Sequence, residues 1–234
     1  MTSSENLSRN FYKHIKRRGL EARTSLEWDR SVVTMLTEIL SPDVQILDVG
    51  CGYGRIAIPL AELGYQIKGL DLSPQLIAEA QEEATKRGLD IEFSVGSMTE
   101  MPYSDASFDA ALCLWSAFNE LLDVSEQAKA LREMYRILRP AGRAVIEGSI
   151  FEEATEEEVR TGLRRGPGNR ISWDVIEGLP NPHYRHDPKS LADLCLGVGI
   201  TGYEIVERHW AGRPRQVLVI TKQQPAVGGS PLAN

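Results

Sequence analysis

The chain has 234 residues, a length that suits one large α/β domain and would be cramped for two. Hydrophobic residues make up 42% of it, but no apolar run approaches the roughly 20 residues of a membrane-spanning helix and the polar start lacks a signal peptide's apolar core, so we expect a cytoplasmic protein with no membrane partner. A total of 26 Lys and Arg against 33 Asp and Glu gives a net charge of -7, which argues against a nucleic-acid partner.

Residues 1–40 are predicted to form a helical segment that acts as a lid. The next hundred residues alternate short apolar runs with amphipathic stretches, which is typical of βαβ units. Residues 44–49, 66–70 and 91–95 are predicted to form strands. A helix over residues 55–63 is expected to end at Gly64, and a second should run from an N-cap at Ser73, with Pro74 in its first turn, to Gly88.

The second half of the chain continues the pattern with strands at residues 108–114 and 143–147. Between them we expect a helix over residues 125–138, which Pro140, Ala141 and Gly142 separate from the following strand. A short helix at residues 190–196 precedes two β runs, 203–210 and 216–221, predicted to form a hairpin. The pattern predicts a doubly wound α/β fold with a mostly parallel, seven-stranded sheet and an antiparallel C-terminal hairpin, within a domain of residues 41–222.

Residues 151–187 interrupt this alternation. They contain an acidic helical piece, a Gly-rich and Pro-rich loop and one predicted strand at residues 171–176. Long insertions in α/β folds are often functional, so we expect this one to face the substrate. The tail, residues 223–234, is rich in Pro, Gly and Ser, a composition that predicts disorder.

A glycine-rich turn follows the first predicted strand. Gly50, Gly52 and Gly54 alternate, and without Cβ atoms they let the backbone turn sharply and approach a ligand closely. Asp71 ends the second strand, where its carboxylate can accept hydrogen bonds from both ribose hydroxyls. These residues predict a nucleotide-type pocket, although the GxGxG spacing differs from the GxGxxG of dinucleotide-binding proteins.

The run Leu47-Asp48-Val49-Gly50-Cys51-Gly52-Tyr53-Gly54 resembles motif I of the class I S-adenosylmethionine (SAM)-dependent methyltransferases. Residues 69–73 resemble the ribose motif of this family and residues 96–103 its adenine loop. Residues 107–110, 138–143 and the closing hairpin are also similar. The resemblance covers about residues 44–148 and 188–221. It implies a Rossmann-like methyltransferase that uses SAM and releases S-adenosylhomocysteine, with cofactor contacts from Asp48, Gly50, Cys51, Gly52, Gly54, Asp71, Leu72, Ser97, Met98, Leu114 and Trp115.

Position 97 departs from the family pattern. The family usually has Asp there, which accepts from the adenine amino group, whereas this chain has the uncharged Ser97. On sequence grounds, Ser97→Asp is therefore expected to tighten SAM binding.

Methyl transfer from a sulfonium is an in-line displacement, so the protein chiefly aligns the reactants. A general base helps only when the acceptor is a neutral hydroxyl or a protonated amine. His183 and His186 are candidate bases, and a structural role is their alternative. Residues expected to wall the acceptor are Tyr12, Trp115, Phe118, Asn119 and Trp173; the alternative for Trp115 and Phe118 is the core.

The acceptor is expected to be a small molecule methylated on oxygen or nitrogen, because strand four lacks the Pro-Pro-Tyr signature of methyltransferases that act on bases or glutamine amides. Two basic groups are either solvated helix faces or sites for an anionic acceptor. They comprise Lys13, Lys16, Arg17, Arg18 and Arg23, and Arg160, Arg164, Arg165 and Arg170. We expect a monomer or a homodimer.

Three isolated cysteines, Cys51, Cys113 and Cys195, predict neither a disulfide framework nor a zinc site, and we expect no metal. Two alternatives to an active methyltransferase stay open. A non-catalytic SAM-binding protein would carry the same cofactor residues. A nicotinamide-dependent oxidoreductase would share the strand, glycine loop and terminal acid, but the glycine spacing and the absence of a Tyr-x-x-x-Lys motif argue against it.

Overall fold

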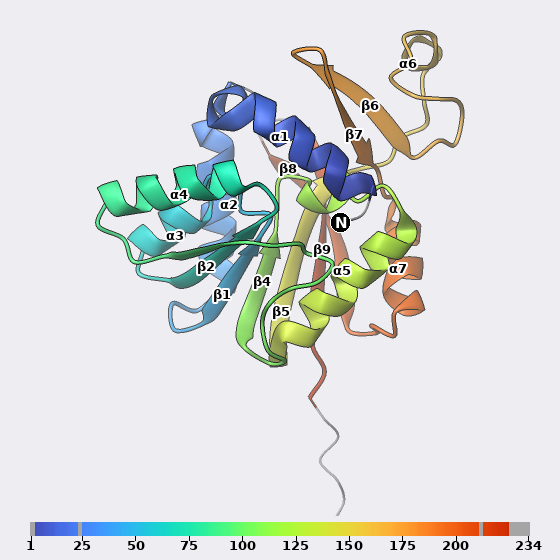
Figure 1. The fold of residues 1–234 in the computed structure, drawn as a ribbon. Helices are drawn as coiled ribbons and strands as arrows, with labels where there is room; N and C mark the ends of the chain where they lie inside the picture. The colour runs from blue at the N-terminus through green and yellow to red at the C-terminus, as the bar shows by residue number, and fades with distance from the viewer. Residues whose placement is uncertain (1–2, 23–24, 211–212, 225–234) are drawn as a thin grey trace, which may run out of the picture.

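The computed structural model describes residues 3–22, 25–210 and 213–224. A seven-stranded sheet in the order β3-β2-β1-β4-β5-β9-β8 forms the centre of the molecule (Figure 1). The first five strands in the chain pair in parallel, and β9 and β8 pair antiparallel at one edge. The strands are β1 (Gln45–Val49), β2 (Gln66–Asp71), β3 (Glu92–Val95), β4 (Phe108–Cys113), β5 (Leu138–Ser149), β8 (Tyr203–Trp210) and β9 (Arg213–Thr221). The predicted fold class is confirmed.

Alternate side chains of the central strands enter two separate cores, one on each face of the sheet. Leu47 and Val49 of β1 pack with α5 (Val124–Ile137) and α7 (Pro188–Gly197), whereas Ile46 faces α2 (Leu26–Ile39) and α3 (Ala57–Glu62). This period-2 division is what a parallel strand covered on both faces requires. The remaining βαβ helix, α4 (Pro74–Lys86), starts at the predicted N-cap, where the Ser73 hydroxyl accepts from the Leu76 amide.

One boundary prediction was wrong. The residues Pro140, Ala141 and Gly142 do not separate the helix from the fifth strand; β5 begins at Leu138 and takes them in as an irregularity in its pairing with β4. Gly142 permits this because a Cβ there would lie 2.8 Å from the Arg139 carbonyl oxygen and 2.9 Å from that of Asp109. The Ala141 amide also donates to the carbonyl oxygen of Lys222, which ties the irregularity to the end of β9.

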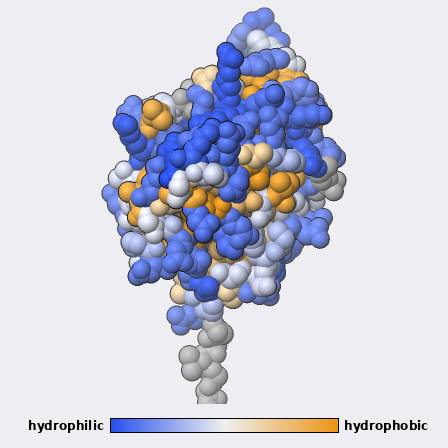
Figure 2. Space-filling view, turned by 60° about the vertical axis from the view of Figure 1, so that its left-hand side comes forward, coloured by the Kyte–Doolittle hydropathy of each residue, from blue (hydrophilic) through white to orange (hydrophobic). Residues whose placement is uncertain are grey.

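Helix α1 (Ser3–Glu21) lies across the carboxyl ends of the parallel strands (Figure 1). Three contacts attach it to separate parts of the domain. The Ser4 hydroxyl accepts from the Leu122 amide, the Tyr12 hydroxyl donates to Glu120 of the short helix η1 (Ala117–Glu120), and Arg17 pairs with Glu83 of α4 at 3.0 Å. The surface viewed in Figure 2 is hydrophilic over most of its area, with apolar side chains in separate patches. None of the helices in the described residues is long and apolar enough to cross a membrane.

The insertion contains a hairpin rather than the single strand predicted. After α6 (Glu156–Arg160), β6 (Ile171–Ile176) pairs antiparallel with β7 (Leu179–Tyr184). Pro180 and Pro182 argue against a strand at β7 because proline has no N–H to donate. A two-stranded sheet has only edge strands, however, and there a missing N–H is tolerated. The two-residue turn suits a hairpin because Glu177 and Gly178 both have positive φ, 50° and 79°. The predicted disorder of the tail concerns residues that, from 225 onward, lie outside the described part of the chain.

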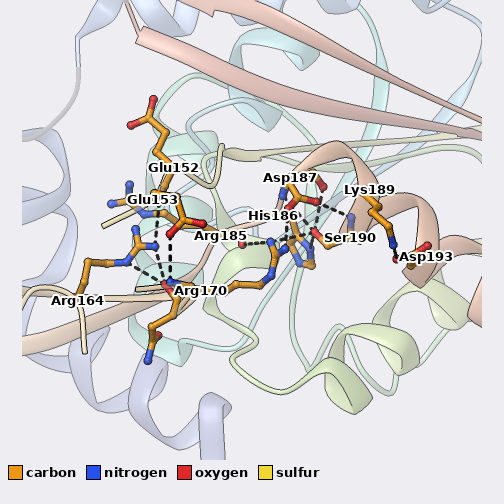
Figure 3. A network of polar contacts seen from close by, with 12 residues as sticks. Glu152, Glu153, Arg164, Arg170, Arg185, His186, Asp187, Lys189, Ser190 and Asp193 are labelled. Atoms are coloured by element: carbon orange, nitrogen blue, oxygen red, sulfur yellow. Dashed lines mark hydrogen bonds and ion pairs between the residues drawn. The ribbon is translucent and has the colours of Figure 1, made fainter. Parts of the chain in front are cut away.

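A buried arginine holds the insertion together (Figure 3). Arg164 is 1% exposed, and its guanidinium donates to the Asn169 carbonyl oxygen at 2.6 Å and to that of Glu152 at 3.1 Å. Arg170 pairs with Asp187 at 2.6 Å, at the N-cap of α7. These bonds join three segments of the insertion to the helix that follows it.

Arg164→Met should loosen the insertion and leave the sheet intact. The substitution keeps most of the buried volume but leaves two carbonyl groups without their charged donor, so we expect the free energy of local opening to fall by about 1 to 3 kcal/mol. Hydrogen exchange should become faster in residues 162–184 and stay unchanged in the parallel strands. Arg160→Met, which removes an exposed pair with Glu157, is the matched control and should change little. Unchanged exchange in Arg164→Met would contradict the role assigned to this side chain.

Candidate active site

A cleft of about 370 Å3 opens at the carboxyl ends of the parallel strands, within the size range of small-molecule sites. The loops after β1, β2, β3 and β4 form its floor, and α1 and the β6–β7 hairpin form its opposite wall. Its floor includes Gly50, Cys51, Gly52, Asp71, Leu72, Ser97, Met98, Leu114 and Trp115, which are nine of the predicted cofactor residues.

The glycine loop brings main-chain atoms to the cleft. Gly50 has φ of 75°, and a Cβ there would lie 2.6 Å from the Ala117 Cβ, so only glycine fits. Gly52 has φ of 54° and its amide points to Asp71. A ligand can therefore approach the peptide groups of this loop without meeting a side chain.

Asp71 is held by two backbone amides. One carboxylate oxygen accepts from the Gly52 amide and the other from the Ser73 amide, both at 2.8 Å. Burial raises the pKa of Asp71, and the two amide hydrogen bonds oppose that rise. The side chain is thus fixed at the edge of the cleft, where a ribose diol would complete its hydrogen bonding.

Asp48 lies behind the glycine loop and does not line the cleft. It is 3% exposed, and its Oδ2 atom has no hydrogen-bond partner in the described part of the chain. Burial, and next the charge of Asp71, raises the pKa of Asp48 to about 7, whereas a hydrogen bond from the Ala57 amide lowers it. A buried acid poised near neutrality next to a cleft is a common feature of functional sites.

A carboxylate from α1 contacts the adenine loop predicted from the sequence. Glu5 is 5% exposed, lines the cleft, and accepts hydrogen bonds from the hydroxyls of Ser97 and Thr99. The Ser97 hydroxyl in turn accepts from the Thr99 amide at 2.9 Å. A negative charge therefore stands beside position 97 although the residue there is uncharged.

Two consecutive left-handed residues shape the turn after β4. Trp115 and Ser116 have φ of 57° and 63°, which is costly for residues other than glycine. The fully buried Glu147 accepts from the Trp115 amide at 2.7 Å and pairs with Arg215. Arg215 also donates to the Ser116 hydroxyl at 2.7 Å, so strands β5 and β9 together hold this turn in place.

Aromatic rings and a guanidinium stack at one end of the cleft. The rings of Trp28 and Trp115 stack with centroids 5.6 Å apart, and Arg55 lies over Trp115, 3.6 Å from the ring centroid. Arg55 pairs with Asp29 at 2.5 Å. This stack gives the cleft a flat, rigid wall.

The β6–β7 hairpin supplies most of the polar groups on the opposite wall. His183 lines the cleft with its Nδ1 atom 3.8 Å from an oxygen of Asp174, and Tyr12 is bonded to Glu120 nearby. Arg185 donates from Nε to the Ser172 hydroxyl at 3.2 Å. The remaining cleft-lining side chain of the hairpin is Asn181.

The structure brings some predicted acceptor and base residues to the cleft but not others. Tyr12, Trp115 and His183 line it. Phe118 lies in the core, Asn119 donates to the Tyr184 carbonyl oxygen, and Trp173 packs against Arg165. None of these three is in the lining of the cleft, and neither is Gly54, whose Cβ would meet Ile58 at 2.9 Å.

His186 also lies away from the cleft lining. It is 4% exposed, packs against the ring of Tyr184 with centroids 4.7 Å apart, and contacts the Ser190 hydroxyl at 3.1 Å. Burial, and next the charge of Arg170, lowers its pKa to about 4, so the ring is neutral near pH 7. These contacts fit the structural alternative for this residue.

Sequence reasoning missed several charged residues of the site, among them Glu5, Glu147, Arg185 and Arg215. Glu5, Glu147 and Arg215 act through partners far away along the chain, as Glu5 does with Ser97, 92 residues later. The one local signal for such a residue was a charged side chain at the end of an apolar strand, as at Glu147.

The arrangement fits an adenosyl cofactor. Glycine-loop amides, a carboxylate fixed at the second strand, and the second acid Asp48 with an unsatisfied oxygen suit a ligand that carries both a ribose and a positive charge. Cys51, Cys113 and Cys195 are free and buried.

Asp48 should make the stability of the protein depend on pH. The folded protein keeps this carboxyl protonated up to about pH 7, whereas the unfolded chain ionises it near its ordinary pKa of 3.8. Between these values only the folded state holds the proton, so the free energy of unfolding falls as the pH rises, by at most about 4 kcal/mol. Asp48→Asn should flatten this fall in urea unfolding measured across that range.

Asp90→Asn, at an exposed position, is the control and should follow the wild-type profile. Parallel profiles for wild type and Asp48→Asn would show that Asp48 is already ionised in the folded protein.

Residues 46–142 match the model of a methyltransferase domain family. The demethylmenaquinone methyltransferase of Thermus thermophilus is 33% identical over 123 residues, which are 52% of this chain and 53% of that protein. The chain thus spans about half the length of this curated relative.

Among solved structures, the 1,6-didemethyltoxoflavin-N1-methyltransferase of Burkholderia thailandensis superimposes with a TM-score of 0.69 at 19% identity, over 96% of this chain and 92% of that one. The magnesium protoporphyrin IX methyltransferase of Synechocystis PCC 6803 gives 0.67 at 16% identity, over 94% of this chain and 100% of that one. Both were solved with S-adenosylhomocysteine, and at these identities the likeness shows the fold alone. The matched region contains the glycine loop and Asp71, so residues 46–142 are similar to a methyltransferase domain, and the fold around them is that of these solved structures.

Proposed function

We propose that the protein transfers a methyl group from SAM to an oxygen or nitrogen atom of a small molecule. The observation that carries this proposal is the cleft itself. One wall presents main-chain amides and the amide-held carboxylate of Asp71, and the opposite wall presents His183, Asp174 and Tyr12. A nucleoside site and a polar acceptor site therefore share one enclosed space.

The cofactor, when bound, supplies a methyl group already activated on a positively charged sulfur. The protein then has to position the two reactants and exclude water. The glycine loop and Asp71 hold the nucleoside end, and Asp48 places a carboxyl group with an unsatisfied oxygen behind the loop. Trp28, Trp115 and α1 close the cleft around the acceptor.

His183 is the group we assign as general base. It is in the cleft lining, and the Asp174 carboxylate at 3.8 Å would stabilise the imidazolium that forms when the ring takes a proton from the acceptor. His186 is not assigned this role because it is buried away from the cleft.

Incubation of the protein with isotope-labelled SAM and a metabolite extract, followed by mass spectrometry, tests the function directly. We expect a labelled small-molecule product. A thermal-shift comparison of SAM, S-adenosylhomocysteine and NAD accompanies it, since a ligand at 100 times its dissociation constant stabilises by about 2.7 kcal/mol. Stabilisation by SAM without any labelled product would favour a non-catalytic SAM-binding protein, and stabilisation by NAD alone would favour an oxidoreductase.

His183→Asn should slow formation of the labelled product by about 100-fold or more if the acceptor must lose a proton. His14→Ala, at an exposed position on α1, serves as the control. An unchanged rate in His183→Asn would remove this residue from the mechanism.

The contact between Glu5 and Ser97 changes the expectation for position 97. Ser97→Asp would set a second carboxylate against Glu5, so we now expect no gain in cofactor affinity from this change alone. Glu5→Gln should weaken binding of S-adenosylhomocysteine about tenfold, because a charged acceptor is lost. The double variant Glu5→Gln/Ser97→Asp should recover the wild-type affinity for S-adenosylhomocysteine, measured by calorimetry, because it again has one carboxylate at this place. Tighter binding by Ser97→Asp alone would contradict this account.

A further inference from the structure

The carboxylates that line the cleft are engaged with other groups of the protein. Glu5 is bonded to Ser97 and Thr99, Asp71 to two amides, and Glu120 to the Tyr12 hydroxyl. Asp174 lies beside His183. The negative charges of the cleft are thus accounted for within the fold.

The arginines of the cleft differ from one another. Arg55 pairs with Asp29 and Arg215 with Glu147. Arg185 lines the same cleft, but no carboxylate of the described residues lies within ion-pair distance of it. Within the described residues its guanidinium donates one hydrogen bond, from Nε to the Ser172 hydroxyl, which leaves the two terminal nitrogens for another partner.

The position of Arg185 is fixed from both sides. Its backbone amide donates to the Arg170 carbonyl oxygen at 2.8 Å, and Ser172, which anchors the guanidinium, is fully buried. The charge of Arg185 also reaches the buried Arg164, where it is the second cause, after burial, of a lowered pKa. Glu158 lies within the field of both arginines, but its carboxylate is bonded to the amide and hydroxyl of Thr155.

The basic group recognised in the sequence does not provide this free charge. Arg160 pairs with Glu157 and Arg170 with Asp187, whereas Arg164 donates to carbonyl oxygens and Arg165 stacks on Trp173. Arg185 is therefore the cation that this part of the structure leaves for a ligand.

We propose that Arg185 binds an anionic oxygen group, a carboxylate or a phosphate, of the methyl acceptor. The proposal rests on the proposed function and specifies its substrate class. Asn181 and His183 of β7 and Arg185, one residue beyond its end, occupy alternate positions along the chain, and all three line the cleft. The planar guanidinium suits bidentate binding of either anion.

Calorimetry on the full chain loaded with S-adenosylhomocysteine tests this binding without requiring turnover. The probes are benzoate, phenyl phosphate and the uncharged benzamide. Wild type should bind at least one of the two anions ten times more tightly than benzamide, and the better anion identifies the acceptor group. Arg185→Gln should lose this preference, Arg185→Lys should keep part of it, and Arg165→Gln, which changes an exposed arginine outside the cleft, should keep all of it.

Unchanged affinity for S-adenosylhomocysteine shows that each variant is folded. Equal binding of anions and benzamide by wild type, absence of anion binding, or a preference that survives in Arg185→Gln would overturn the proposal.

A second measurement separates this proposal from the proposed function. The metabolite extract is divided by anion exchange before incubation with labelled SAM, and we expect labelled product only from the retained, anionic fraction. Product that arises from the unretained fraction alone would contradict the role of Arg185 while leaving methyl transfer intact. Anion preference in calorimetry without product from either fraction would contradict methyl transfer and leave the role of Arg185 in anion binding intact.

Discussion

The two hydrogen bonds that Asp71 accepts are the interaction on which the cleft depends. Its carboxylate fixes the Gly52 amide of the loop after β1 and the Ser73 amide at the start of α4. Its own carbonyl oxygen accepts from the Gly96 amide at 2.9 Å, which ties in the loop after β3. One residue at the end of one strand thus aligns the loops of three strands, and the amides that bind it determine where a ligand can approach the backbone.

Burying two acidic side chains at the ends of β1 and β2 lowers the stability of the fold. Asp48 and Asp71 are both buried, burial raises the pKa of each, and the charge of Asp71 adds to the rise at Asp48. A protein that served only its own stability would place apolar side chains there. Under the proposed function, Asp48 and Asp71 would lie near the positively charged sulfur of the cofactor, and that charge would offset the unfavourable burial of the two acids. The strained turn at Trp115 and Ser116 is a second such cost, and the buried pair of Glu147 and Arg215 maintains it.

The parts of the site that could be predicted are those encoded by neighbours in the chain. Alternating strands and helices, the glycine loop, Asp71 and the Ser73 cap are local patterns, and the sheet order follows once the loops are short. Glu5 and Arg185 were not predictable, because their roles depend on partners brought together by packing. The same limit applies to His183 and His186, which are three residues apart: one lines the cleft, and the other packs against the rings of Phe118 and Tyr184. The register of the hairpin places His183 beside the cleft, whereas His186 lies beyond the hairpin and bridges to Ile150.

Helix α1 connects the two halves of the cleft. Glu5, near its start, contacts the loop expected to hold adenine, and Tyr12, two turns later, bonds to Glu120 on the side that faces the hairpin. A rigid helix cannot leave one of these contacts without disturbing the other, so any displacement of α1 opens both halves together. By the reciprocity of linked equilibria, two ligands that both favour this position of α1, one on the cofactor side and one on the acceptor side, would raise each other's affinity by the same factor. Such coupling would follow from the helix and would need no contact between the two ligands.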